Sequence, residues 1–309
     1  MCAMPANLNC ILLNACGAAY NVEPGTNVYA PDTVYSPHVP YSQSPQVAYG
    51  GDGFLNIATV GQCEFGIVVA FRGTLPPSKT DPDSWLDWLQ DFFEVPVSTP
   101  DGANHVPGQV HEGFYYATTS IIDQVRKLVG DCNPGPTNPV FVTGHSKGGV
   151  LASIAAYILS QNLGVPDIQP VITFASPRPG DVTFQKGFES VLKQTRFENY
   201  RDIVPLVPPP MDFIGRVSAL PGLTFTASGR KLSQLLERAK DWNYVPVGSM
   251  QFVTKDFKLI SGESLLAQEL DMAEEFIEDF AKRNFSSFGD AHSLRPGYGY
   301  NSGICGTSH

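Results

Sequence analysis

The chain has 309 residues, of which 42% are apolar and 16% charged, and its net charge is −10. This composition is typical of a globular protein with a sizeable core. No cluster of lysine and arginine occurs, which argues against a nucleic-acid partner, because nucleic-acid binding depends on basic side chains that neutralise phosphates. No apolar run reaches the roughly 20 residues that a membrane-spanning helix needs, so no transmembrane segment is expected.

The first 20 residues alternate small and apolar side chains, which predicts a helix packed on the body of the protein. The first basic residue of the chain is Arg72, so the basic start of a secretory signal is missing. The compartment stays open between a cytoplasmic protein and the mature form of an exported one. The cysteines form no CxxC pair, so no metal site is indicated, and they could be disulfides or free thiols. They are Cys2, Cys10, Cys16, Cys63, Cys132 and Cys305.

The middle of the chain alternates strand and helix patterns. Residues 65–71 (FGIVVAF) indicate a buried strand, and apolar residues recur at helical spacing between Phe114 and Val129. Further along the chain we expect a strand at 139–144, a helix at 150–161, and strands at 171–176 and 196–200. This order predicts an α/β fold whose mostly parallel central sheet carries helices on both faces.

The last third of the chain departs from this alternation. Residues 229–242 and 262–284 have the pattern of two amphipathic helices, the second with an acidic outer face that we interpret as solvated. No linker rich in glycine, serine or charge separates this part from the rest. We therefore expect one domain over residues 1–309, with an elaborated segment at about 211–285.

Residues 144–148 (GHSKG) fit the G-x-S-x-G pattern between a predicted strand and a predicted helix. A serine at such a turn needs a strained backbone, and the flanking glycines are needed because a Cβ would collide with the neighbouring strand or helix. The geometry exposes the Ser146 hydroxyl, while the N–H of Lys147 can hold an oxyanion. We expect the side chains of His145 and Lys147 to be structural and surface groups, respectively.

A serine nucleophile needs a histidine base and an acid that orients it. On an open α/β sheet the acid and then the histidine follow the serine in the chain. His292 and His309 are the only histidines beyond Ser146, and His309 is the last residue, where fraying is expected. Asp202, just after the strand at 196–200, is the favoured acid.

Two other aspartates are rivals of Asp202. Asp181 follows a Pro-Gly pair and has the pattern of a turn residue, and Asp290 is two residues from His292 and is expected to cap the loop.

Seven segments together resemble the class 3 lipases, the fungal-type triacylglycerol lipase family with the α/β-hydrolase fold. They are AFRGT (70–74), WLQDFF (88–93), VHEGFYYA (110–117), VFVTGHSKGG (140–149), TFASPRPGD (173–181), RDIVPLVPP (201–209) and DAHSLRPGY (290–298). The resemblance implies a catalytic triad of Ser146, Asp202 and His292. It also implies an oxyanion hole in which the hydroxyl and N–H of Thr74 join the N–H of Lys147. Fungal members usually carry leucine where this chain has Lys147, and residues 211–285 are longer than their pattern.

A lid helix is implied at the place where the family carries one. Trp85, Trp88 and Phe92 lie on one helical face, although a helix packed on a core would show the same pattern. Such a helix could cover the acyl pocket in water and present its tryptophans to lipid, so we expect activity to rise at an interface. The resemblance also places Asp91 near Thr74, where a hydrogen bond between them is plausible.

The resulting hypothesis is a serine carboxylic ester hydrolase that acts on lipid esters, acylglycerols first, at a lipid–water interface. Phospholipase A1 and feruloyl esterase activities remain open within the same family. From another class, a catalytically inactive fold used as a binding module also remains. The reaction calls for no metal and no organic cofactor, and the oligomeric state is left open.

Overall fold

The computed structural model describes most of the chain. The described residues are 4–23, 25–51, 55–74, 92–93, 95–209, 214–215, 218–219, 227–261, 268, 272, 275 and 285–306. The expected helix at 262–284 therefore lies almost wholly outside the described residues, as does much of the expected elaboration at 211–285.

An eight-stranded sheet forms the centre of the protein, in the order β1-β2-β3-β6-β7-β8-β9-β10. Neighbouring strands from β3 to β9 are parallel, while the pairs β1–β2, β2–β3 and β9–β10 towards the edges are antiparallel, so the sheet is mostly parallel as expected. The strands are β1 (Gln46–Gly50), β2 (Asn56–Cys63), β3 (Gly66–Phe71), β6 (Val140–His145), β7 (Val171–Phe174), β8 (Gln194–Asn199), β9 (Ser249–Val253) and β10 (Leu259–Ser261). A separate pair consists of β4 (Pro96–Ser98) and β5 (Gln109–His111).

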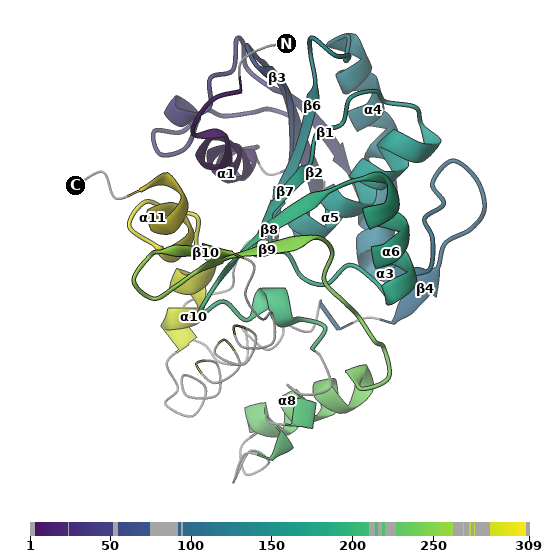
Figure 1. Ribbon diagram of the computed structural model, residues 1–309, viewed down its shortest axis with the longest axis vertical. Helices are drawn as coiled ribbons and strands as arrows, with labels where there is room; N and C mark the ends of the chain where they lie inside the picture. The colour runs from purple at the N-terminus through teal and green to yellow at the C-terminus, as the bar shows by residue number, and fades with distance from the viewer. Residues whose placement is uncertain are drawn as a thin grey trace.

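Helices cover both faces of the sheet, as Figure 1 shows. On one face lie α1 (Leu8–Ala19) and α11 (Gly299–Cys305), and on the other α3 (Glu112–Thr119), α4 (Ile122–Asp131), α5 (Lys147–Tyr157) and α6 (Val182–Val191). The remaining helical segments are η1 (Ser36–His38), the π-helix η3 (Ile158–Asn162), η4 (Val204–Leu206), α8 (Ala227–Ala239) and α10 (Phe285–His292).

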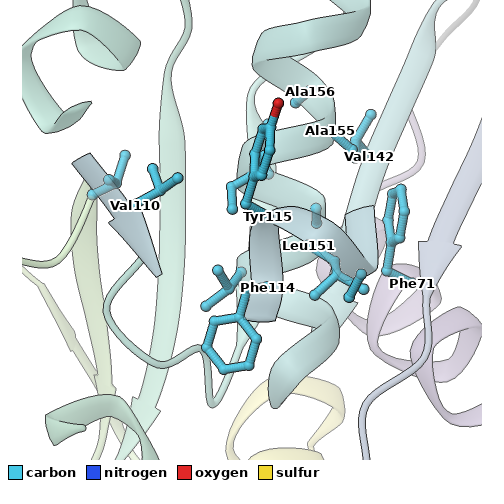
Figure 2. Close-up of a cluster of buried hydrophobic side chains, with 14 of the residues drawn as sticks. Phe71, Val110, Phe114, Tyr115, Val142, Leu151, Ala155 and Ala156 are labelled. Carbon is cyan, nitrogen blue, oxygen red and sulfur yellow. The ribbon is translucent and has the colours of Figure 1, made fainter. Parts of the chain in front are cut away.

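Strand β3 shows why each face has its own core. Successive side chains of a strand point to opposite faces. Val69 and Phe71 join the cluster beneath α3 to α6, whereas Val68 and Ala70 join the cluster beneath α1 and α11. Figure 2 shows the first cluster, in which Leu151 of α5 lies near Phe71 between that helix and the sheet. The strand is buried on both faces, which is why its sequence is continuously apolar.

The helical pattern between Phe114 and Val129 is interrupted rather than continuous. Helix α3 ends at Thr119 and α4 begins at Ile122. Thr118 and Ser120 donate side-chain hydrogen bonds to the carbonyls of Phe114 and Ala117, respectively. Such local bonds from serine and threonine compete with helical geometry, and apolar spacing alone does not register them.

A disulfide between Cys10 and Cys305 joins α1 to α11. It closes a loop of 295 residues, a constraint worth on the order of 5 kcal/mol in the chain-entropy account of disulfides. Cys16, Cys63 and Cys132 are free thiols, so both of the states considered for the cysteines occur. Within the described residues, no helix is long and apolar enough to span a bilayer.

Candidate active site

Ser146 lies at the turn between β6 and α5. Its backbone has φ 59° and ψ −133°, a conformation that costs energy for any residue except glycine. Its N–H donates to the carbonyl of Phe174 on β7 at 3.0 Å, which ties the turn to the sheet. The hydroxyl is buried, and within the described residues it has no hydrogen-bond partner. The strain predicted for this serine is therefore present.

The glycines around Ser146 are required because the surrounding backbone leaves no room for a Cβ. A Cβ on Gly144 would lie 1.9 Å from the carbonyl oxygen of Gly148, and one on Gly148 would lie 2.1 Å from the carbonyl oxygen of Phe71. Both obstacles are backbone atoms, which cannot swing aside. The expected collision with a neighbouring strand and helix is confirmed at these two positions.

The expected acid and base are in contact. The carboxylate oxygens of Asp202 lie 2.9 and 3.1 Å from His292 Nδ1, and both side chains are buried. Asp202 follows β8, held by a bond from its own N–H to the carbonyl of Asn199, and His292 is the last residue of α10. Because a carboxylate only accepts, Nδ1 donates, and a neutral His292 presents Nε2 as its acceptor. That tautomer is the one a general base needs.

Two further donors hold the Asp202 carboxylate. The hydroxyl of Tyr300 donates to Oδ2 at 2.7 Å, and the N–H of Val204 donates to Oδ1 at 3.0 Å. Tyr300 is fully buried, and its pKa is raised well above the usual value by burial and by the adjacent Asp202 charge, so it stays a donor. Sequence reasoning missed Tyr300, because nothing in its local pattern distinguishes it from Tyr298. Only the packing of α11 selects it.

His145 joins the two halves of the site. Its Nε2 is 2.9 Å from the carbonyl oxygen of His292, so Nε2 carries the proton and Nδ1 accepts from the hydroxyl of Tyr20 at 2.8 Å. Its ring centroid is 4.5 Å from that of His292. Burial, and then the nearby His292, lower the pKa of His145 well below its usual value. Its bonds are consistent with the structural role expected of it, and they also fix the backbone of His292.

Of the two segments expected to form the oxyanion hole, the one that leads into Thr74 lies against the serine turn and the other is the start of α5. A Cβ on Gly73 would lie 2.9 Å from the Cβ of Ser146, so the segment leading into Thr74 passes directly against the serine. Lys147 is the first residue of α5, and N–H groups in a helix's first turn lack a partner within the helix. Thr74 is half-buried. The segment before Thr74 and the N-terminus of α5 therefore both adjoin Ser146.

Other residues considered for the site have different positions. Asp181 caps α6 by accepting from the N–H of Phe184 at 2.8 Å, in agreement with its expected role in a turn. Asp290 lies within α10, and its carbonyl accepts from the N–H of Ser293. His309 is outside the described residues. Among the described residues, Asp202 is therefore the aspartate bonded to His292.

The residues named for the lid are mostly outside the described part of the chain: Trp85, Trp88 and Asp91 are not described. Phe92 is described and buried, with its ring centroid 5.8 Å from that of Phe114 on α3. It belongs to the core cluster beneath the helices, so in this conformation it is covered rather than presented to solvent.

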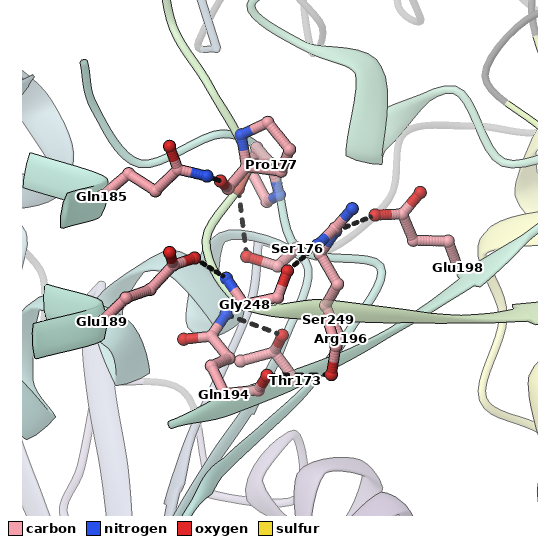
Figure 3. A network of polar contacts seen from close by, with 11 residues as sticks. Thr173, Ser176, Pro177, Gln185, Glu189, Gln194, Arg196, Glu198, Gly248 and Ser249 are labelled. Atoms are coloured by element: carbon pink, nitrogen blue, oxygen red, sulfur yellow. Dashed lines mark hydrogen bonds and ion pairs between the residues drawn. The ribbon is translucent and has the colours of Figure 1, made fainter. Parts of the chain in front are cut away.

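A buried polar network supports the strand that leads to Asp202. Arg196 and Glu198, both on β8, form an ion pair of 2.6 Å, and Arg196 also donates to the carbonyl of Gly248. Figure 3 shows this pair and the neighbouring Gln194, which donates to Thr173 at 3.3 Å. Burying charge is costly unless it is paired and hydrogen-bonded, and Arg196 meets this cost with bonds from Nε and Nη1. The network therefore fixes β8 against β7 and β9.

A cavity of about 350 Å³ opens beside this site rather than over it. Its lining includes Tyr200, Arg201 and Tyr298, from the turn after β8 and the segment before α11. Neither Ser146 nor His292 is part of that lining. The cavity is therefore distinct from the space in front of the serine.

Comparisons with known proteins agree with the geometry. Residues 68–211 match the family described as Lipase (class 3). Phospholipase A1-II 4 of Oryza sativa subsp. japonica is 30% identical over 185 residues, covering 51% of this chain and 44% of that protein. A lipase of Rhizomucor miehei is 31% identical over 154 residues, covering 48% of this chain and 39% of that protein. The matches cover less than half the length of these curated relatives.

The fold has solved counterparts. The native Rhizomucor miehei lipase–propeptide complex superposes with a TM-score of 0.53 at 23% identity, covering 80% of this chain and 67% of that one. A triacylglycerol lipase of Penicillium expansum superposes with a TM-score of 0.51 at 17% identity, covering 85% of each chain. The chain has the α/β-hydrolase fold, and its residues 68–211 are similar to the class 3 lipase family.

Proposed function

We propose that the protein hydrolyses carboxylic esters of lipids, with Ser146 as the nucleophile. The observation that carries the proposal is the arrangement at one end of the sheet. A strained serine is held against a helix N-terminus, and a buried Asp202–His292 pair adjoins it through His145. The similarity of residues 68–211 to the class 3 lipase family supports the same reaction.

The chemistry follows from the donors and acceptors present. His292 Nε2 takes the proton of Ser146 Oγ as the oxygen attacks the ester carbonyl, and the Asp202 carboxylate stabilises the imidazolium. The N–H groups of Thr74 and Lys147 hold the oxyanion. His292 then gives its proton to the departing alkoxide, which leaves an acyl-serine. A water molecule, deprotonated by His292, releases the carboxylic acid and restores the serine.

Acylglycerols are the first candidate substrate class and phospholipids the second. The names of the relatives favour both, since they include a lipase and several enzymes named phospholipase A1. The lid remains part of this proposal: Trp85, Trp88 and Phe92 would shield the acyl pocket in water and open at a lipid surface.

The nucleophile is tested by labelling with a fluorophosphonate probe, followed by peptide mapping. We expect the label on Ser146 and its loss in Ser146→Ala, with kcat lowered by about 10⁶. Ser190→Ala is the matched control, because Ser190 lies exposed on α6, and its hydroxyl donates only to the carbonyl of Gly187. A Ser146→Ala enzyme that keeps a tenth of the activity would exclude Ser146 as nucleophile.

The substrate class is tested with triacylglycerol, phosphatidylcholine and feruloyl esters, each assayed below and above its solubility limit. We expect the acylglycerol to be turned over fastest and its rate to rise when an emulsion forms. A preference for phosphatidylcholine would assign the second candidate. Equal rates with and without an interface would contradict the lid.

A further inference from the structure

Lys147 is the residue of the serine turn that the family pattern leaves unexplained, and the structure gives its side chain a definite partner. Lys147 Nζ donates to Asn56 Oδ1 at 2.9 Å. Asn56 in turn donates from Nδ2 to Ser120 Oγ at 3.1 Å, and Ser120 donates to the carbonyl of Ala117. A chain of hydrogen bonds therefore runs from the first residue of α5 to the end of α3. The side chain is not the free surface group that the sequence suggests.

Asn56 lies at the place where β2 meets the end of β3. Ala58 pairs with Phe71, and the N–H of Arg72 donates to the carbonyl of Ile57 at 2.9 Å. Asn56 precedes Ile57 on β2, and Gly73, which packs against Ser146, follows Arg72. Lys147 is thus bonded to the strand that borders the segment entering Thr74.

Within the described residues, the segment beyond Arg72 is held mainly by side chains, and the Gly73 backbone is bonded to the Tyr20 hydroxyl. The regular ladder between β2 and β3 ends at Phe71, and the bond from Arg72 is the next one after it. Arg72 Nη2 also donates to the carbonyl of Leu55 at 3.1 Å. Side-chain bonds to residues 55 and 56, from Arg72 and from Lys147, therefore hold this corner against the serine turn.

We propose that the Lys147 side chain is a positioning residue that sets the spacing between the two oxyanion N–H groups. The inference rests on the proposed function, in which the N–H groups of Lys147 and Thr74 hold the oxyanion. One of these groups belongs to Lys147 itself, and the other follows the strand end that Asn56 borders. The bond between Lys147 and Asn56 joins the residue that carries the first group to the strand beside the segment that leads to the second.

The residue type fits this role. An ammonium group on a four-carbon stem can reach a neighbouring strand and make a directional, charge-assisted hydrogen bond, whereas leucine, usual at this position in fungal members, has no donor. An oxyanion hole is sensitive to such spacing, because a displacement of about 1 Å in a catalytic group can cost on the order of a hundredfold in rate. The hydrogen bond from Lys147 to Asn56 therefore acts on the transition state more than on substrate binding.

The test compares Lys147→Met and Asn56→Ala with the double variant. We expect each single variant to lower kcat about tenfold with KM within twofold, because the loss is confined to the transition state. The double variant should be no slower than either single variant, since both remove the same bond. Asn56→Asp, which keeps an acceptor for the ammonium group, should restore most of the rate.

Lys127→Met is the matched control. Lys127 also donates to a side-chain oxygen, that of Asp131 at 2.7 Å, but on the exposed surface of α4. The kcat of the Lys127→Met variant should equal that of the wild type. A melting temperature measured for every variant separates a loss of fold from a loss of rate. If Lys147→Met lowers the melting temperature but leaves kcat unchanged, the side chain is only structural and the proposal is wrong.

Fluorophosphonate labelling separates this inference from the proposed function. If the wild type is not labelled at Ser146, the proposed function fails. If the wild type is labelled and Lys147→Met reacts at the same rate, only the positioning role fails; we expect a rate about tenfold lower. If Lys147→Met instead raises KM for phosphatidylcholine alone, the ammonium group contacts the headgroup phosphate, and the positioning role is overturned.

Discussion

The serine turn and the Asp202–His292 pair are built in different ways. The turn is a short continuous stretch from β6 into α5, and its shape is set by backbone atoms packed too closely for a Cβ. The pair joins residues 90 positions apart in the chain, and its shape is set by side-chain hydrogen bonds, including the one from Tyr300. One part is specified locally and the other by tertiary packing.

The difference has a consequence for mutation. Backbone crowding cannot be relieved without moving strands, so substitutions of the crowded glycines in the turn are expected to act on folding. A side-chain hydrogen bond can be removed while the chain keeps its path, so changes in the pair are expected to act on rate. Substitutions in each region can therefore show whether the two parts are as different as their construction indicates.

Among the substitutions that compare the two regions, the largest expected effect is on the pair. Asp202→Asn keeps the size of the side chain but offers His292 an amide, which favours the wrong tautomer, so kcat should fall by about 10⁴. Asp181→Asn is the control, because asparagine also caps helices well, and its activity should match the wild type. Steady-state kinetics with a soluble short-chain ester measures both. A greater loss in Asp181→Asn would reverse the assignment of the acid.

The next effect is on the turn. In Gly144→Ala the new Cβ would meet the carbonyl of Gly148, and the free energy of unfolding should fall by more than about 4 kcal/mol. In Gly130→Ala the new Cβ on α4 would meet no atom within 4 Å, and stability should rise by about 0.4–1 kcal/mol. Urea denaturation measures the two changes. Equal stabilities would show that the turn tolerates a Cβ after all.

The same contrast explains what could be predicted from sequence. The G-x-S-x-G turn lies between a buried strand and a helix, so its residues and their strain follow from neighbours in the chain. The contact between Asp202 and His292 was predicted indirectly, because few histidines follow Ser146 and because a strand ends just before Asp202. The local sequence pattern was sufficient to predict the serine turn. It was sufficient for the contact between Asp202 and His292 only after other residues had been eliminated.

The partners of the site were not predictable in this way. Tyr300 reaches Asp202 only because α11 packs beneath the sheet, tied to α1 by the Cys10–Cys305 disulfide. The bond from Lys147 to Asn56 likewise depends on how β2 pairs with β3. Both contacts join segments distant in sequence, and neither residue type carries a local signal for such a bond.

Tyr300→Phe tests whether the pair depends on its packing. The substitution removes one hydrogen bond to a buried carboxylate and leaves the ring in place, so kcat should fall about tenfold and the free energy of unfolding by about 1.5–3 kcal/mol. Tyr157→Phe on α5 is the control and should change neither quantity. A Tyr300→Phe enzyme with normal kcat and lowered stability would show that Asp202 is held well enough by Val204 and His292.

The smallest effect concerns His145, which joins the turn to the pair. Its pKa is lowered in the folded state by burial and by His292, so below its ordinary pKa of about 6.5 the unfolded chain binds a proton that the folded chain does not. The contribution of His145 to the free energy of unfolding is therefore complete above pH 6.5. It is lost as the pH falls, by about 1.4 kcal/mol per pH unit. His145→Gln should remove that part of the slope between pH 6.5 and 5.

Urea denaturation at several pH values measures the slope. His38→Gln is the control, since His38 is an exposed residue of η1, and its slope should match the wild type. An unchanged slope in His145→Gln would mean that His145 is protonated in the folded protein. Its Nδ1 would then be a donor rather than the acceptor of the Tyr20 hydroxyl. In that case the join between the turn and the pair would rest on a charged group, and the two regions would be coupled electrostatically as well as through hydrogen bonds.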